Sequence, residues 1–139
     1  MLMGEYKYTI DEKGRLNLPT RFREQMGSSL VVTRWLDQCL VLFSQQRWES
    51  ICQQITAQGM VKTRDMQRFL FAMATEVMPD RQGRILISGP LRQHAGLDKD
   101  VTIIGVGTHA ELWNSQAWQD KQSAFGSQEL EAALEELSL

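Results

Sequence analysis

The sequence predicts an α+β fold in which two sequence-related halves share one barrel-like β core with flanking helices. The main observation is an internal repeat: DEKGRLNLP at residues 11–19 returns 69 positions later as DRQGRILIS at residues 80–88. In both copies, alternating apolar residues follow the Gly-Arg pair, as in a strand with one buried face. A unit of about 70 residues buries little surface alone. Two such units most simply pack about a pseudo-twofold axis, with their apolar strand faces in one core.

The first unit can be divided into elements from its local patterns. Residues 6–10 and 15–18 alternate like strands around a tight turn at 11–14, where Asp bonds its own backbone and Gly supplies a positive φ. Pro19 opens a short helix that Gly27 ends. The remaining predicted elements are strands at 30–35 and 39–43 and a helix capped by Ser44, with Trp48, Ile51, Cys52 and Ile55 on one face.

The second unit follows the same order, and two further helices lie outside the repeats. The predicted second-unit elements are strands at 75–79, 84–88, 101–106 and 110–113, a short helix at 90–95 and a helical turn at Trp118. Thr63 is expected to cap a helix between the units, and residues 127–137 form an acidic helix with a leucine stripe. The predicted organisation is therefore a first repeat at 1–60, a linking helix at 61–74, a second repeat at 75–121 and a C-terminal acidic helix at 122–139.

Composition and charge exclude several classes of protein. The 139 residues have 42% apolar and 23% charged side chains and a formal charge of −2, which excludes a disordered chain or one that coats nucleic acid by bulk positive charge. The charge is uneven: residues 1–34 have six basic and four acidic side chains, residues 62–94 six and three, and residues 111–139 one and six. No apolar run approaches the ~18 residues of a membrane span, and the start does not resemble a signal peptide. We therefore expect a cytoplasmic protein with no membrane partner.

Two arginines are the strongest candidates for function. Arg15 and Arg84 begin strands at hairpin tips, where a guanidinium can bind phosphate or reach guanine O6 and N7 in the major groove. The alternative is that Arg15 only pairs with Asp11 across the turn, as an exposed ion pair worth roughly 0–1 kcal/mol. The expected role of the turn residues Asp11, Gly14, Asp80 and Gly83 is to orient the hairpins.

An enzyme is the main rival class. Two Asp residues related by a pseudo-twofold axis are also found in hydrolases with a two-carboxylate dyad. Here, however, both lie in polar hairpin tips, and no Ser/His/Asp or Cys/His set has a suggestive spacing. Cys39 and Cys52 lack near partners for a metal site, so we expect buried, reduced thiols. The sequence predicts no catalytic residues, metal or cofactor.

The doubled motif, together with LRQHAGL at residues 91–97, resembles the MraZ family of bacterial transcriptional regulators, which have the swapped-hairpin fold of AbrB and SpoVT. The resemblance covers residues 4–113. It implies a ring-forming repressor that binds tandem direct repeats in double-stranded DNA, upstream of the division and cell-wall gene cluster encoding it, and therefore a location at the nucleoid. The motif Asp and Arg of the family map onto Asp11, Arg15, Asp80 and Arg84. Lys13 and Arg81, in the same turns, are further predicted DNA contacts, and an antitoxin-type or structural ring protein of the same fold is the alternative.

One aromatic residue is a candidate for subunit contact. On the linking helix, Phe69, Leu70 and Met73 fit one core-facing stripe, whereas Phe71 points well away from it. We therefore expect Phe71 to pack against a neighbouring subunit. The short-helix arginines Arg21, Arg23 and Arg92 are expected to be solvated or at subunit contacts.

Overall fold

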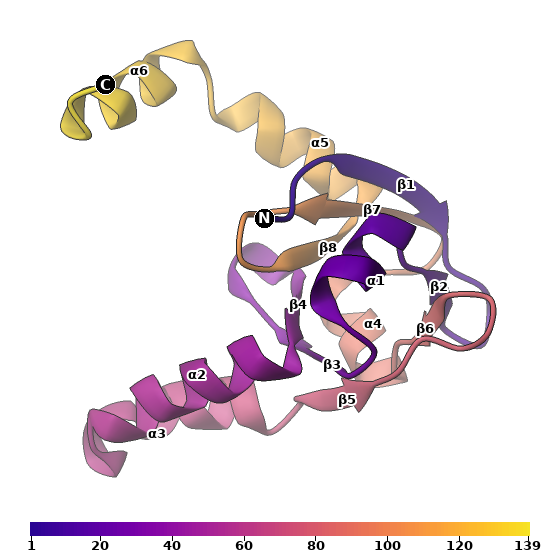
Figure 1. Ribbon diagram of the computed structural model, residues 1–139. Helices are drawn as coiled ribbons and strands as arrows, with labels where there is room; N and C mark the ends of the chain where they lie inside the picture. The colour runs from indigo at the N-terminus through magenta and orange to yellow at the C-terminus, as the bar shows by residue number, and fades with distance from the viewer.

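Six antiparallel strands form the main sheet, and two short strands form a separate ribbon, in a computed structural model that describes residues 1–139 (Figure 1). The sheet order is β1-β7-β8-β4-β3-β5. Its strands are β1 (Glu5–Thr9), β3 (Leu30–Arg34), β4 (Leu40–Ser44), β5 (Thr75–Val77), β7 (Asp100–Gly105) and β8 (Ala110–Asn114). The ribbon pairs β2 (Arg15–Asn17) with β6 (Arg84–Leu86). These strands lie within one or two residues of the predicted ranges.

The two halves exchange their first strands. β1 of the first half pairs with β7 of the second, and β5 of the second half pairs with β3 of the first. The other cross-half pairs join equivalent strands: Leu16 lies opposite Ile85 in the ribbon, and Val41 opposite Glu111 between β4 and β8. Both pairs are repeat equivalents, so the pseudo-twofold axis passes through them. The expected α+β swapped-hairpin fold is confirmed.

The core lies between the sheet and the ribbon. Alternate residues of each strand point inward, so Leu16 and Ile85 from the ribbon meet Leu30, Leu42 and Ile103 from the sheet, all of them fully buried. Two short helices close this core, α1 (Thr20–Met26) and α4 (Gly89–Ala95). Each contributes two buried apolar side chains, Phe22 and Met26 from α1 and Leu91 and Ala95 from α4. Because the two halves share one core, the turns at residues 11–14 and 80–83 occupy equivalent positions, both at the same end of the molecule.

A helical hairpin of α2 (Gln45–Ala57) and α3 (Met60–Phe71) projects from this body (Figure 1). The Ser44 hydroxyl accepts a hydrogen bond from the backbone N–H of Arg47, as expected for the cap of α2. The expected cap at Thr63 is wrong. Because α3 begins earlier, after Gly59, Thr63 lies inside the helix and its hydroxyl donates to the Gly59 carbonyl at 2.8 Å. A single 3-10 turn, η1 (Leu36–Gln38), joins β3 to β4.

The chain ends in two further helices. α5 (Ser115–Ala124) is longer than the single turn expected at Trp118, and α6 (Ser127–Glu136) stands away from the body (Figure 1). The leucine stripe of α6 is therefore exposed, with Leu130 at 49% and Leu134 at 37%. No helix has both the length and the apolar composition needed to span a membrane.

Candidate nucleic-acid interface

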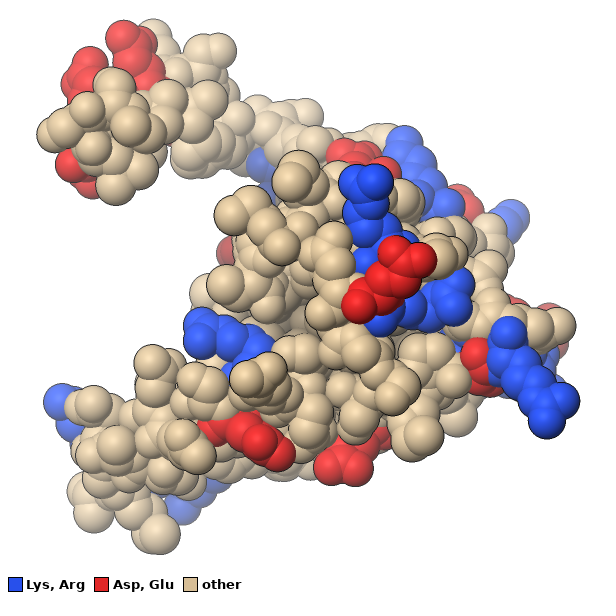
Figure 2. Space-filling model, in the orientation of Figure 1, with Lys and Arg blue, Asp and Glu red and all other residues tan.

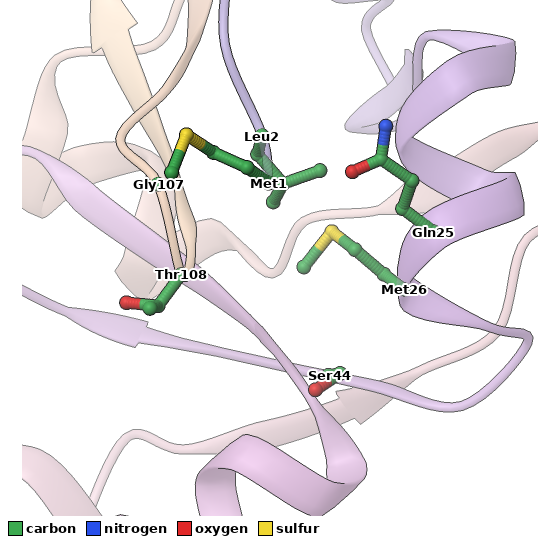
Figure 3. A pocket seen from close by; sticks show the side chains of 7 residues that line it. All are labelled: Met1, Leu2, Gln25, Met26, Ser44, Gly107 and Thr108. Carbon is green, nitrogen blue, oxygen red and sulfur yellow. The ribbon is translucent and has the colours of Figure 1, made fainter.

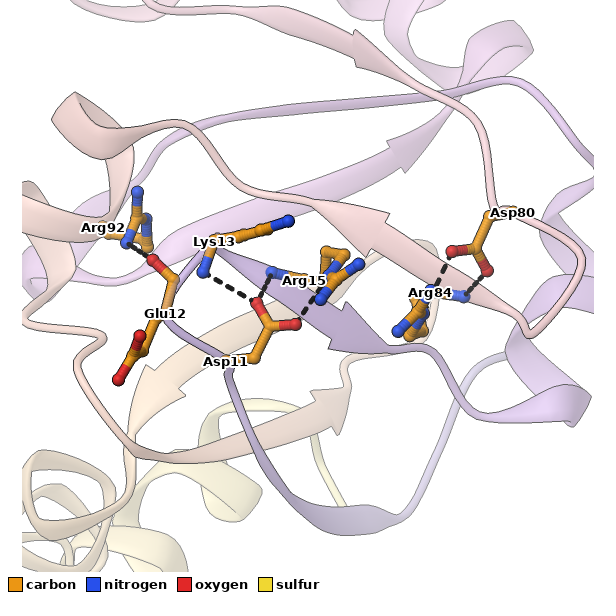
Figure 4. A network of polar contacts seen from close by, with 7 residues as sticks. All are labelled: Asp11, Glu12, Lys13, Arg15, Asp80, Arg84 and Arg92. Carbon is orange, nitrogen blue, oxygen red and sulfur yellow. Dashed lines mark hydrogen bonds and ion pairs between the residues drawn. The ribbon is translucent and has the colours of Figure 1, made fainter.

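Each Asp-x-x-Gly-Arg turn is organised by its aspartate (Figure 4). In the first turn, Oδ1 of Asp11 accepts hydrogen bonds from the backbone N–H groups of Lys13 at 3.0 Å and Arg15 at 2.8 Å. In the second, Oδ1 of Asp80 accepts from Gln82 and Arg84, both at 2.9 Å. The two turns therefore have the same hydrogen-bonding pattern, although Lys13 is replaced by Gln82.

The same aspartates hold the two arginine side chains. Nε of Arg15 donates to Oδ2 of Asp11 at 2.6 Å, and Nε of Arg84 donates to Oδ2 of Asp80 at 3.0 Å. The Nη groups of both arginines make no hydrogen bond within the chain. Each guanidinium is thus fixed in direction and presents its two-nitrogen end to solvent, the edge that binds guanine or phosphate in bidentate geometry. The exposed ion pair and the free binding edge are compatible, so the two sequence-based alternatives do not exclude each other.

The ionisation of the two aspartates argues against a hydrolase dyad. The pKa of Asp11 is lowered chiefly because its carboxylate accepts the backbone N–H of Arg15, with the Arg15 side chain adding to the effect. The pKa of Asp80 is lowered by the same contacts from Arg84. A dyad that shares a proton needs one raised pKa, so both carboxylates here are ionised turn anchors. No three His, Cys, Asp or Glu side chains converge to hold a metal ion.

Each turn is also braced by an arginine from the other half. Arg92 of α4 donates from Nε to the Ile87 carbonyl at 3.1 Å and from Nη1 to the Glu12 carbonyl at 3.5 Å, which brings its side chain over Gly14 (Figure 4). Arg23 of α1 donates to the Leu18 carbonyl at 3.3 Å and lies over Gly83.

The expectation that Arg23 and Arg92 are simply solvated is therefore wrong, because both bind backbone carbonyls of their own chain. A subunit contact at either residue stays a prediction. Their shared place in the repeat, 69 positions apart, was visible in the sequence. The exchange of strands, which brings each arginine to the opposite turn, could not be inferred from that spacing.

The glycines of the two turns permit this close approach. Gly14 has φ +89° and Gly83 φ +78°, backbone angles that residues with a Cβ rarely adopt. The neighbouring strands also exchange backbone hydrogen bonds with them: the Gly14 carbonyl accepts from Ile87, and the Gly83 carbonyl accepts from Leu18. The glycines thus join each turn to the opposite strand of the ribbon.

Charged side chains are unevenly distributed over the molecule (Figure 2). Lys and Arg gather over α1 and at the end where the two turns lie, with a few acidic side chains among them, and others lie on the α2–α3 hairpin. In contrast, α6 has only acidic charged side chains. The predicted contacts Lys13 and Arg81 are both exposed at the turns. The turn end is therefore the face with the charge that attracts a polyanion.

Phe71 does not lack a partner in its own chain. Its ring lies 5.6 Å from that of Trp48 on α2, in an edge-to-face contact. The premise that Phe71 is isolated is wrong, because α2 folds back beside α3 and supplies the second partner. Phe69, expected in the core stripe, is instead 38% exposed and lies beneath the guanidinium of Arg34 at 4.2 Å. The assignment of Phe71 to a subunit interface stays a prediction.

A hollow of about 350 Å³ lies beside the N-terminus, at the edge of the sheet (Figure 3). Its lining consists of Met1, Leu2, Gln25, Met26, Ser44, Gly107 and Thr108. None of these side chains is charged or a histidine, so the charged groups of the candidate site all lie elsewhere, at the turns.

Fold and site together define a class: a two-repeat swapped-hairpin protein with paired, arginine-bearing turns on one exposed ribbon. Comparison with known proteins identifies the family within this class. The family described as "MraZ protein, putative antitoxin-like" matches residues 1–69 and again 70–139. The chain belongs to the MraZ family.

Relatives named "Transcriptional regulator MraZ" match most of the chain. One from Moorella thermoacetica is 45% identical and one from Carboxydothermus hydrogenoformans 44%, each match covering 86% of this chain and 85% of the relative. One from Micrococcus luteus is 40% identical over 90% of this chain and 92% of its own. The family is one of regulators and not of enzymes.

Proposed function

We propose that the protein is a transcriptional regulator that binds double-stranded DNA through the β2–β6 ribbon and its two turns. One observation carries the proposal: two guanidinium groups, each held at Nε and free at Nη, lie on the exposed side of one antiparallel ribbon. The major groove admits such a ribbon, and Arg is the side chain best suited to guanine and to phosphate. The names of the relatives support the same function.

The protein acts as a ring of identical subunits on tandem direct repeats. Each motif region carries only a modest local excess of positive charge, so one subunit makes few phosphate contacts. Linking several equivalent sites raises affinity by orders of magnitude without new contacts. Neighbours in a ring are related by rotation without a dyad between them, which suits direct repeats better than palindromes. The targets are the repeats upstream of its own division and cell-wall gene cluster, where a bound ring at the nucleoid represses transcription.

A DNA mobility shift tests this function. The probe is a duplex from the region upstream of the protein's own gene, and the control is a duplex of the same length and composition in shuffled order. We expect retarded bands with the first probe at concentrations that leave the second free, and weaker binding as salt rises. Equal retardation of both duplexes, or none of either at low salt, contradicts the proposal.

The second candidate is an antitoxin-type or structural ring protein of the same fold, a possibility that the family description favours. Such a protein forms the ring but does not distinguish the upstream duplex from the shuffled one. Light scattering on the same samples separates the two functions: assembly without sequence-selective retardation supports the second candidate.

A further inference from the structure

The exposed side of the ribbon holds four side chains. Leu16 and Ile85 are fully buried beneath it, so the residues on either side of them point outward. The register places Arg15 opposite Leu86 and Asn17 opposite Arg84. Directly opposed side chains in an antiparallel pair lie about 5 Å apart. The proposed DNA-binding face thus consists of two cross-strand pairs, each containing one arginine and one other residue.

The repeat symmetry holds for the arginines and breaks at their partners. At the offset of 69, Arg15 corresponds to Arg84, whereas Asn17 corresponds to Leu86. Leu86 is 59% exposed and lines a hollow together with Met78, which is 72% exposed. The residue equivalent to Met78 in the first half is the polar, exposed Thr9. One end of the face is therefore apolar and the other polar.

We propose that Asn17 and Leu86 are specificity-determining residues that give the ribbon a direction on DNA. This inference rests on the proposed function. In the major groove, Asn forms bidentate hydrogen bonds with adenine N6 and N7, and apolar side chains contact the thymine methyl group. Arg84 with Asn17 then selects guanine beside adenine, and Arg15 with Leu86 selects guanine beside thymine.

Direction matters because a symmetric ribbon binds a site equally well in both orientations. With identical side chains in the two halves, each subunit would favour a palindromic step and would not distinguish the two strands. The Asn17–Leu86 difference makes one orientation better than the other. Subunits around a ring then engage repeats that all run the same way, which is the arrangement that rotation without a dyad requires.

The test measures base preference in the full-length protein. The probes are the upstream duplex that the native protein binds and a set of derivatives with one base pair changed in each. The proteins are the native chain, Asn17→Leu, Leu86→Asn and the control Arg21→Ala, which changes an exposed side chain on α1. Circular dichroism and light scattering accompany each titration, and Asn17→Ala and Leu86→Ala serve if the first variants fold poorly.

We expect the native protein to lose about tenfold or more in affinity when the adenine beside one guanine is changed. Asn17→Leu loses this discrimination and keeps the discrimination at both guanines, whereas Leu86→Asn replaces a preference for thymine with one for adenine. Arg21→Ala keeps the native profile. Unchanged base profiles in both variants overturn the inference while leaving DNA binding intact, and so does a Leu86 variant that changes only the assembly state. Failure of the native protein to distinguish any duplex overturns the proposed function as well.

Discussion

Arg92 lies against Gly14, although the two residues belong to different halves of the chain. A Cβ placed on Gly14 would lie 3.0 Å from Nε of Arg92 and would clash with the Ile87 carbonyl oxygen. Arg23 is placed in the same way over Gly83, where its Cζ would be 2.7 Å from an added Cβ. Because of the strand exchange, each turn is supported by the opposite half, and the two turns act as one surface.

A methyl group at Gly14 should therefore destabilise the fold. Gly14→Ala combines the strain of a positive φ with a backbone clash, and we expect the free energy of unfolding to fall by about 1–3 kcal/mol. Gly27→Ala is the matched control, since Gly27 has φ +88° with no atom within 4 Å of an added Cβ. Thermal unfolding followed by circular dichroism measures both. Equal losses at the two positions contradict the close approach of the opposite half.

Loss of Arg92 should loosen the first turn more than the second. Arg92→Ala removes the hydrogen bonds to the Ile87 and Glu12 carbonyls, so the turn amides of Lys13 and Arg15 should exchange with solvent faster. Arg23→Ala should act on Gln82 and Arg84 instead. The measurement is amide hydrogen exchange by NMR, with Arg21→Ala as the control. A loss of protection spread evenly over both turns is the result that rules out this cross-half support.

The stabilising contribution of Asp11 and Asp80 to the two turns should be lost only at low pH. The pKa values of Asp11 and Asp80 lie below the ordinary value of 3.8 because backbone N–H groups and arginines favour the ionised form. A pKa that is lower in the folded chain than in the unfolded chain stabilises the fold, fully so above the unfolded value. This contribution is lost as pH falls from there through the folded values. Carboxyl carbon NMR titration should give pKa values below 3.8 for both residues; values above 3.8 contradict the hydrogen bonding described.

Assembly should depend on α3. Met66 is 50% exposed on this helix, and Phe71 packs on Trp48 near its end. A glutamate at either position should lower the assembly state seen by light scattering, because a charge in an apolar contact is costly. Phe71→Glu should also lower the melting temperature, since it removes the Trp48 contact. Gln53→Glu, at an exposed polar position of α2, is the control. A native assembly state in both variants places the interface elsewhere, with the α6 leucines as the next position to test.

Much of the fold could be predicted from the sequence because its strongest signal is the repeat. The spacing of the two motifs identified equivalent turns, and alternating residues such as Leu16 and Leu18 identified the buried side of each strand. The pairing of β1 with β7 does not follow from alternation, which defines a face but not a partner; only the family resemblance implied an exchange of hairpins. Long-range contacts that depend on this exchange, such as Arg92 over Gly14, were missed for the same reason.

Errors on the helices have a different cause. Thr63 has the residue type of a cap, but α3 begins at Met60 because Gly59, with its positive φ, turns the chain from α2. The prediction for Phe71 depends on its angle on a single helix, and that angle contains no information about a second helix packed beside it. At the candidate site, the residue types are evident from the motif. The hydrogen bond from each arginine Nε to its aspartate, and the absence of hydrogen bonds at Nη, can be seen only in the three-dimensional structure.

The proposed DNA binding depends on the free ends of the Arg15 and Arg84 guanidinium groups. The most direct test is the affinity of the double variant Arg15→Ala/Arg84→Ala for the upstream duplex, measured by fluorescence anisotropy beside native protein and Arg64→Ala/Arg68→Ala. The control removes two exposed arginines from α3, so the change in net charge is the same. Losing each base contact costs about 1–3 kcal/mol per subunit, so the turn variant should bind the upstream duplex at least about tenfold more weakly, with a native melting profile. Native affinity in the turn variant, or an equal loss in the α3 control, would contradict the account.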